Sequence, residues 1–231
     1  MPDDVIEAVQ NWRYERKIRI DDIGVNAMES IILSNRVFFR KLHEERQINN
    51  IYLDDADYNA FFANIDGSTH RKKYRIRWYG DLFGDARQPI LEAKIKEGLV
   101  GSKERYRLKD FRLNKSFATG FVKALLAGVE GSTVLKSTLR GLRPTLINSY
   151  VRRYYISSDG LYRLTLDYDL SFYKVETDSG TVLSKRHQNG LVVEIKYDLE
   201  ADSGVDIVTN DLVYRISKNS KYANGFESTQ Y

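Results

Sequence analysis

The chain has 231 residues, of which 42% are hydrophobic and 12% aromatic, so it is long enough to bury a substantial core in one domain. It contains no cysteine, which excludes disulfides, thiolate metal sites and cysteine nucleophiles, and its histidines (His43, His70 and His187) do not lie at metal-ligand spacing. The net charge of +4 is too small to identify a partner. Because no apolar run is long enough to cross a bilayer and the N-terminus is acidic, we expect a soluble, cytoplasmic protein.

The first part of the chain predicts helices and strands in alternation. A short helical signal covers residues 3–9, within a possible N-terminal helix of residues 1–10. Residues 13–20 alternate charged and apolar side chains, which is typical of a strand. Asp21 or Asp22 is a candidate cap for a helix that continues through Ile32. A strand over residues 48–54 and a short helix around residues 58–62 follow.

The rest of the chain is dominated by strand patterns, interrupted by a helical pattern over residues 116–142. One further helix is expected at residues 205–213. We therefore predict an α+β fold in which residues 1–231 form a single domain, built on an antiparallel sheet that could close into a barrel. The predicted strands are residues 73–79, 90–96, 103–108, 149–156, 162–170, 181–184 and 191–197.

Several of these strands carry charged side chains on one face. Because successive side chains of a strand point to opposite sides, Lys73, Arg75 and Arg77 share a face, opposite Tyr74 and Ile76. The same alternation groups Glu15 with Lys17; Glu92 with Lys94 and Lys96; Arg163 with Asp167 and Asp169; and Glu194 with Lys196.

Two interpretations of these faces are open. One side of an antiparallel sheet commonly meets solvent, which would make the charges ordinary surface groups. If the faces point inward instead, so many enclosed charges are unfavourable unless they pair or bind a ligand. The provisional inward set contains eleven cations (Lys17, Arg75, Arg77, Lys94, Lys96, Lys103, Arg152, Arg163, Lys196, Lys218 and Lys221) and five carboxylates (Glu15, Glu92, Asp167, Asp169 and Glu194).

Such an excess of cations predicts a polyanionic ligand. Arginine forks bind phosphate oxygens in a bidentate manner and lysine adds point charge. The remaining carboxylates are the oxygen ligands that Mg²⁺ or Mn²⁺ prefers. No glycine-rich phosphate loop of the Walker type is present, so side chains rather than backbone amides would hold the phosphates.

Seven segments resemble, in the expected order, the VTC domain, the polyphosphate polymerase domain of the vacuolar transporter chaperone complex. They are YERK (14–17), YRIRWYG (74–80), LEAKIK (91–96), SYVRRYY (149–155), YRLTLDYDL (162–170), VVEIKYD (192–198) and SKNSKYANG (217–225). The resemblance extends from about residue 13 to 225. It implies the fold of the CYTH-like triphosphate tunnel metalloenzymes, an antiparallel barrel of about eight strands with a charged lining and helices packed around it.

The resemblance also implies roles for individual residues. Arg75 and Arg77 resemble the arginines that grip the nucleotide triphosphate, and Glu194 resembles the glutamate that holds the catalytic metal, with Glu15 and Glu92 as helpers. The implied catalytic set is Arg75, Arg77, Lys94, Arg152, Arg163 and Glu194, and the implied phosphate-binding set is Lys17, Lys96, Lys103, Lys196, Lys218 and Lys221.

Two positions depart from the family pattern. Arg13 stands where many tunnel enzymes have the first glutamate of Glu-x-Glu-x-Lys, which shifts metal binding toward the later carboxylates. Asn219 stands where family members more often have an aromatic residue. No segment resembles the regulatory SPX domain or the membrane helices of the eukaryotic complex.

The leading hypothesis from sequence is a polyphosphate polymerase that uses ATP as phosphoryl donor with Mg²⁺ or Mn²⁺. An inorganic or nucleoside triphosphatase is the first alternative, because both reactions need the same cationic site. A non-catalytic binder of polyphosphate or nucleic acid is the second, although the tyrosines lie mainly opposite the cations. Asp167 and Asp169 fit equally well as metal ligands or as structural partners of the inward arginines.

Overall fold

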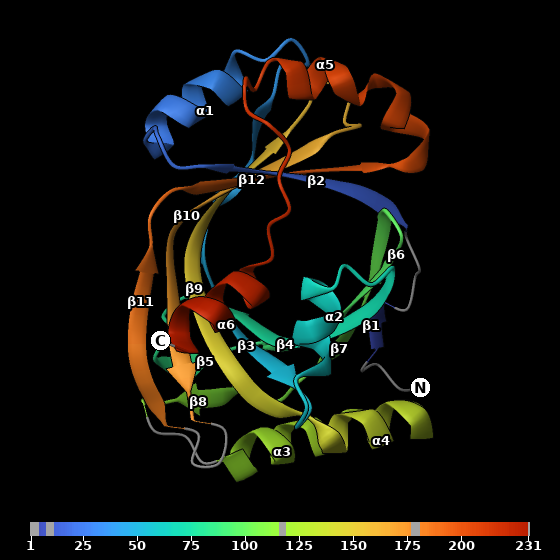
Figure 1. Ribbon diagram of the computed structural model, residues 1–231, viewed down its shortest axis with the longest axis vertical. Helices are drawn as coiled ribbons and strands as arrows, with labels where there is room; N and C mark the ends of the chain where they lie inside the picture. The colour runs from blue at the N-terminus through green and yellow to red at the C-terminus, as the bar shows by residue number, and fades with distance from the viewer. Residues whose placement is uncertain (1–4, 8–11, 116–118, 177–180, 231) are drawn as a thin grey trace.

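Eight antiparallel strands pair with one another in a ring (Figure 1). The computed structural model describes residues 5–7, 12–115, 119–176 and 181–230. Strand β2 pairs with β12 through eight residue pairs, whereas it pairs with β7 through only two, Arg13 with Gly101 and Tyr14 with Val100. In ring order the strands are β2 (Arg13–Ile20), β12 (Leu191–Asp198), β10 (Arg163–Val175), β9 (Arg143–Ile156), β3 (Arg40–Asp54), β4 (His70–Tyr79), β6 (Ile90–Glu97) and β7 (Val100–Arg107).

Besides the ring, the described residues form four shorter strands. β1 (Val5–Glu7) pairs with β7, and β11 (Val182–Gln188) pairs with β10. β5 (Gly84–Ala86) and β8 (Phe111–Leu113) form a separate two-stranded sheet. The helix expected near the N-terminus is therefore wrong over residues 5–7, because these residues take part in β pairing. The remainder of that prediction lies outside the described residues.

Two groups of helices pack on the outer surface of the ring (Figure 1). α1 (Val25–Leu33) and α5 (Val205–Asn210), the latter preceded by the 3₁₀ helix η1 (Leu199–Gly204), cover one side. Their apolar residues join the outward residues of β2, β10 and β12 in one buried cluster. α3 (Thr119–Ala127) and α4 (Thr133–Gly141) cover the opposite side, over a second cluster that includes outward residues of β3, β4 and β6.

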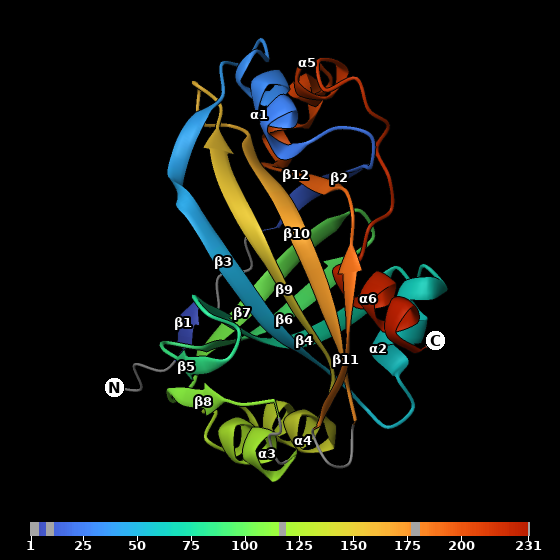
Figure 2. The ribbon, with the colours of Figure 1, turned by 90° about the vertical axis from the view of Figure 1, so that its left-hand side faces the viewer.

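The other two helices, α2 (Asn59–Ile65) and α6 (Lys221–Gln230), lie together at one end of the ring (Figures 1 and 2). Tyr222 of α6 stacks on Tyr52 of β3 with ring centroids 5.1 Å apart. The ring centroid of Phe61 in α2 lies 4.7 Å from that of Phe226 in α6. Inward residues of β3, β9 and β10 complete this apolar cluster. We call this end of the ring the helix end, and the opposite end of the same strands the far end.

Most predicted strands are confirmed, and the helices show the main differences. α1 begins after Gly24, which supplies no side-chain cap, so Asp21 and Asp22 do not cap it. The single helical pattern over residues 116–142 is two helices within its described part, and the strand expected over residues 149–156 begins earlier, at Arg143. Helix α6 was not predicted. The single-domain assignment stays a prediction.

Among the described residues, every helix is too short or too polar to span a lipid bilayer.

Candidate functional site

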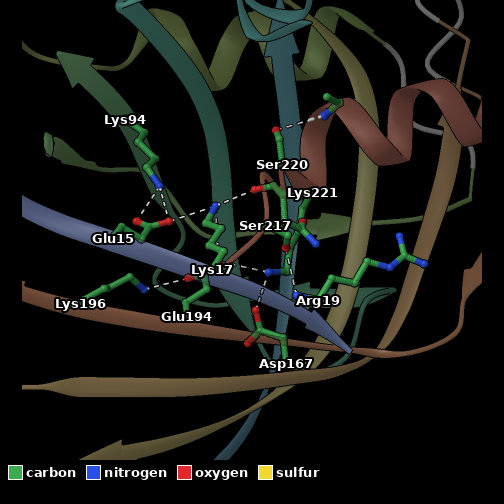
Figure 3. A network of polar contacts seen from close by, with 12 residues as sticks. Glu15, Lys17, Arg19, Lys94, Asp167, Glu194, Lys196, Ser217, Ser220 and Lys221 are labelled. Carbon is green, nitrogen blue, oxygen red and sulfur yellow. Dashed lines mark hydrogen bonds and ion pairs between the residues drawn. The ribbon is translucent and has the colours of Figure 1, made fainter. Parts of the chain in front are cut away.

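The charged side chains meet inside the ring (Figure 3). Glu15 of β2 accepts hydrogen bonds from Lys94 of β6 at 2.8 and 3.0 Å, although β7 lies between these two strands in the ring. Glu15 also lies 3.0 Å from Lys17 on its own strand. Contacts between strands that are not neighbours require that both side chains point inward. The solvent-facing interpretation is therefore wrong for these strands.

Glu194 of β12 is surrounded by four cations. It lies 2.9 Å from Lys196, 3.3 Å from Lys221, 3.4 Å from Arg152 and 3.8 Å from Lys17. Burial alone would raise the pKa of Glu194, but the charges of Lys196, Lys221 and Lys17 outweigh burial and hold the pKa well below its ordinary value. Glu194 is therefore ionised throughout the physiological range.

Asp167 of β10 is completely buried and lies between two cations. Arg152 donates to Asp167 through two nitrogens, one of them at 2.6 Å, and Lys221 forms an ion pair with the same carboxylate. Burial raises the pKa of Asp167, yet Arg152 and Lys221 lower it below the ordinary value. Of the two roles that the sequence left open, the geometry favours the structural one.

Asp169 does not lie inside the ring. The pairing of β10 with β9 shifts between Tyr168 and Ser171, and Asp169 has a φ of 53°, so the alternation of side chains is interrupted. Its side chain is 65% exposed and lies 3.6 Å from His187. Grouping Asp169 with Asp167 on one face was therefore wrong, because the prediction assumed an uninterrupted strand.

Glu92 of β6 gathers a second group of cations. It lies 2.6 Å from Arg75, 3.6 Å from Arg77, 3.7 Å from Lys103 and 3.5 Å from Arg105. Burial raises the pKa of Glu92, but Arg77 and Arg75 together hold it well below its ordinary value. Arg105 was not in the predicted set, although its position two residues after Lys103 would have placed it on the same face.

Three lysines lie side by side next to this group. Lys73 of β4 pairs in register with Lys94 of β6, which pairs in turn with Lys103 of β7. Desolvation inside the ring lowers the pKa of Lys73 to about 7, and the charges of Lys17 and Lys94 add to this effect. Desolvation likewise lowers the pKa of Lys94 to about 8 and that of Lys103 to about 7. Like charges directly opposite one another are destabilising, so this row favours an anion that can separate them.

Uncharged polar atoms on the same inner face lack partners. Asn148 Nδ2, Thr165 Oγ1 and Asn219 Nδ2 are buried without a hydrogen bond within the described residues. Thr165 pairs in register with Glu194, and the backbone oxygen of Asn219 accepts a hydrogen bond of 2.9 Å from Lys17. Because buried polar groups are nearly always hydrogen-bonded, these atoms indicate a site that a bound molecule or water completes. The sequence analysis did not select Asn148 or Thr165, since isolated polar residues carry no distinctive pattern.

Most of the predicted site residues come together in this network, but three do not. Arg163 shares the inward face of β10 by alternation but is exposed at the far end, and Lys218 is exposed in the segment before α6; within the described residues neither joins the network. Lys96 is half-buried and donates to the backbone oxygen of Leu99. The residues that come together form two groups: Glu15, Lys17, Lys94, Arg152, Glu194, Lys196 and Lys221 are linked by ion pairs around Glu15 and Glu194. Arg75, Arg77 and Lys103 are linked to Glu92.

The three candidate metal ligands do not converge on one point. Among the described residues, no three acidic or histidine side chains form a group that could hold a metal ion. Mg²⁺ and Mn²⁺ sites of phosphoryl-transfer proteins are often held by one or two carboxylates together with substrate phosphates and water. Glu194, with the unpartnered Thr165 hydroxyl across the neighbouring strand, fits such a partial site.

The comparison with known families covers nearly the whole chain. The sequence pattern of the VTC domain family matches residues 12–230. The chain belongs to the VTC domain family. No curated protein sequence matches this VTC domain.

Solved structures with the same fold cover most of the VTC domain at low identity. HpAC1 from Hippeastrum, provisionally named an adenylyl cyclase and described as having a dominant triphosphatase activity, is 18% identical with a TM-score of 0.52, covering 94% of this chain and 95% of its own. PH1819 from Pyrococcus horikoshii OT3 is 13% identical with a TM-score of 0.52, covering 93% and 99%. A provisionally named adenylate cyclase from Vibrio parahaemolyticus is 11% identical with a TM-score of 0.50, covering 91% and 96%. These likenesses show the fold, a ring-like antiparallel sheet with surrounding helices, as the sequence analysis predicted.

Proposed function

We propose that this VTC domain is a metal-dependent phosphoryl-transfer enzyme that holds a chain of phosphates on the inner face of its ring. The observation that carries this proposal is the excess of inward cations around Glu92 and Glu194, together with the unpartnered buried atoms of Asn148, Thr165 and Asn219. A triphosphate supplies the charge and the hydrogen-bond acceptors that these groups lack. Family membership and the triphosphatase activity described for HpAC1 support the same substrate class.

Catalysis in this site would be electrostatic and positional. Arg75 and Arg77 would hold phosphate oxygens through their forked donors, while Lys94 and Lys103 would add charge. Arg152, with Lys221 beside it, would face the phosphates from the β9 side of the ring. Phosphoryl transfer develops charge on the oxygens of the transferring group, so fixed cations that already surround that position lower the barrier without reorganisation.

A divalent metal fits this arrangement as a partner of the substrate. Mg²⁺ or Mn²⁺ would supply a Lewis acid that polarises the phosphoryl group, with Glu194 as its main protein ligand. Four cations already surround Glu194, so a metal charge would be repelled until phosphates neutralise them. Glu15 and Glu92 are occupied by lysine and arginine partners, and we assign them to orienting those cations.

We infer that ATP is the donor and that a phosphate chain is the acceptor. A terminal oxygen of the chain would attack the γ-phosphorus, the bond to the β,γ-bridging oxygen would break, and ADP would leave. Water in place of the phosphate chain would make the protein a triphosphatase. This second candidate is favoured by the activity described for HpAC1, whose chain has the same fold.

Product analysis of the purified protein tests the proposal. The protein is incubated with ATP and Mn²⁺, or with tripolyphosphate and Mn²⁺, and the products are separated by size. We expect polymers of phosphate and ADP from ATP. Hydrolysis of tripolyphosphate without any polymer would assign the triphosphatase reaction instead. Binding of polyphosphate without turnover of either substrate would overturn the enzyme assignment and leave the non-catalytic function.

A further inference from the structure

Flat side chains form a layer immediately beyond the phosphate-binding groups, at the far end of the ring. Tyr79 follows Arg77 by two residues on β4, and Tyr154 follows Arg152 by two residues on β9. Strand β3 lies between them and carries Arg46. The Arg46 guanidinium lies 5.4 Å from the ring centroid of Tyr79 and 5.8 Å from that of Tyr154. We call Arg46, Tyr79 and Tyr154 the Tyr–Arg–Tyr layer.

This layer is continuous with the inner face but lies away from α2 and α6. On the same strands, the helix end is marked by Tyr52 and Leu146, which contact α6. Two residues along a strand correspond to about 6.6–6.8 Å, so the layer lies one short step outward from Arg77 and Arg152. Burial raises the pKa of Tyr154 to about 12, against the charge of Arg152, so its ring stays neutral in the physiological range.

The layer has surface available for a ligand. Tyr79 is 43% exposed, Arg46 is exposed and Tyr154 is half-buried. Stacking on tyrosine and on an arginine plane binds nucleobases with little preference for base identity, because every base has a π-face. A nucleoside triphosphate matches this arrangement, because its phosphates correspond to the cationic inner face and its flat base to the layer beside it.

We propose that the Tyr–Arg–Tyr layer binds the nucleobase of a nucleoside triphosphate whose phosphates lie on the cationic inner face. This inference rests on the proposed function and adds to it the residues that distinguish a nucleotide from inorganic triphosphate. The nucleotide then lies with its phosphates toward α6 and its base at the far end. Selectivity for ATP over tripolyphosphate comes from the layer, whereas affinity for the phosphates comes from the cations.

The test compares ATP with tripolyphosphate in four variants, of which Arg46→Ala removes the arginine of the layer. Tyr79→Leu removes the exposed ring, Tyr79→Phe keeps it, and Tyr168→Leu is the matched control. Tyr168 also stacks against an arginine, Arg153 at 5.3 Å, but Arg153 is bound to Glu29 of the outer helix α1, so this pair lies on the outside of the ring. Binding of each ligand is measured by calorimetry without metal, and KM is measured with Mn²⁺. Thermal unfolding verifies that each variant is folded.

We expect Tyr79→Leu to weaken ATP binding and raise the KM for ATP at least about fivefold, since stacking contributes about 1–3 kcal/mol per base. Tripolyphosphate binding should change less than about twofold, and Tyr79→Phe and Tyr168→Leu should behave as the wild type. Arg46→Ala should repeat the Tyr79→Leu result for ATP. Equal losses for the two ligands, or no loss for ATP, would overturn the inference while leaving the proposed function intact. Failure of the wild type to bind either ligand would overturn both.

Discussion

At the scale of single residues, Glu194 combines an inward carboxylate with four surrounding cations, and one substitution separates its two roles. Glu194→Gln keeps the shape and removes the charge. We expect turnover with ATP and Mn²⁺ to fall by about 100-fold or more, because the metal loses its main protein ligand. Binding of tripolyphosphate without metal should persist or strengthen, since one repelling charge is gone.

The control for this prediction is Glu45→Gln. Glu45 pairs with Arg153 and accepts from Tyr168 on the outer surface, so its charge does not reach the phosphates. Full turnover in Glu194→Gln would exclude Glu194 as the metal ligand. A loss of tripolyphosphate binding in step with turnover would mean that Glu194 acts only by positioning the cations.

The ionisation of Lys73 couples the binding of tripolyphosphate to the uptake of protons. Its pKa of about 7, lowered by burial and then by Lys17 and Lys94, leaves it mostly neutral at pH 8 in the empty protein. A bound phosphate favours the charged form, so we expect tripolyphosphate to bind with uptake of protons at pH 8. Calorimetry in two buffers of different ionisation enthalpy measures this uptake. Lys73→Met should reduce it, whereas Lys72→Met should not, because Lys72 points outward to Glu104.

The same lysine affects stability in a defined direction. Between pH 7 and pH 10.5, the ordinary pKa of lysine, Lys73 carries a proton in the unfolded chain that it lacks in the folded protein. Its contribution to the free energy of unfolding therefore increases with pH across this window. Lys73→Met should flatten that dependence in denaturant titrations at pH 7 and pH 9. An unchanged slope would mean that Lys73 is charged in the empty protein.

The sequence predicted which side chains share a face better than it predicted how deep they lie. Alternation along the strands grouped Arg75 with Arg77, and Glu92 with Lys94, because the period of two is a property of the backbone. The structure shows that these faces point into the ring. Alternation failed at Asp169, where a shift in pairing interrupts the period. It also could not show that Arg163, at the start of β10, is exposed at the end of the ring, since depth depends on the neighbouring strands.

At the scale of elements, α6 is the part of the site that the sequence did not predict. The helix contains Asn224 and Gly225, which are poor helix formers, and it directs Lys221 inward against Asp167 and Glu194. Its stability comes from tertiary packing, which a local pattern does not carry. A Cβ on Gly225 would lie 2.3 Å from Phe172 Cδ1 and 2.7 Å from Leu146 Cδ2, so this glycine allows α6 to approach β9 and β10.

We predict that Gly225→Ala pushes α6 away from the ring. Overpacking of this kind costs about 1–3 kcal/mol of unfolding free energy, measurable in denaturant titrations. Turnover should fall as well, because Lys221 moves with the helix. Gly120→Ala in α3 is the control, since a Cβ there has no neighbour within 4 Å and the variant should be neutral or slightly more stable. If the two variants have equal stability, α6 does not pack as closely as the structure indicates.

At the scale of the whole molecule, the empty ring holds more positive than negative charge on its inner face. A polyanion should therefore stabilise the protein before any metal is added. At about 100 times its Kd, a ligand of the folded state adds about 2.7 kcal/mol, which corresponds to roughly 5–10 °C in Tm for a chain of this size. We expect this shift with tripolyphosphate in EDTA and none with Mn²⁺ alone. Sulfate at equal ionic strength serves as the control, and a shift with Mn²⁺ alone would indicate a preformed metal site.

The unequal pairing of β2 has a consequence for biosynthesis. Residues 13–20 are synthesised before residues 191–198, but eight of their residue pairs are with β12 at residues 191–198 and only two are with β7. Until residues 191–198 have been synthesised, the nascent chain must keep this edge from pairing with other strands, and contacts so distant in sequence form slowly. The ring is therefore completed only once residues 191–198 have been synthesised, and a chain truncated before residue 191 would retain an open edge that is prone to aggregation.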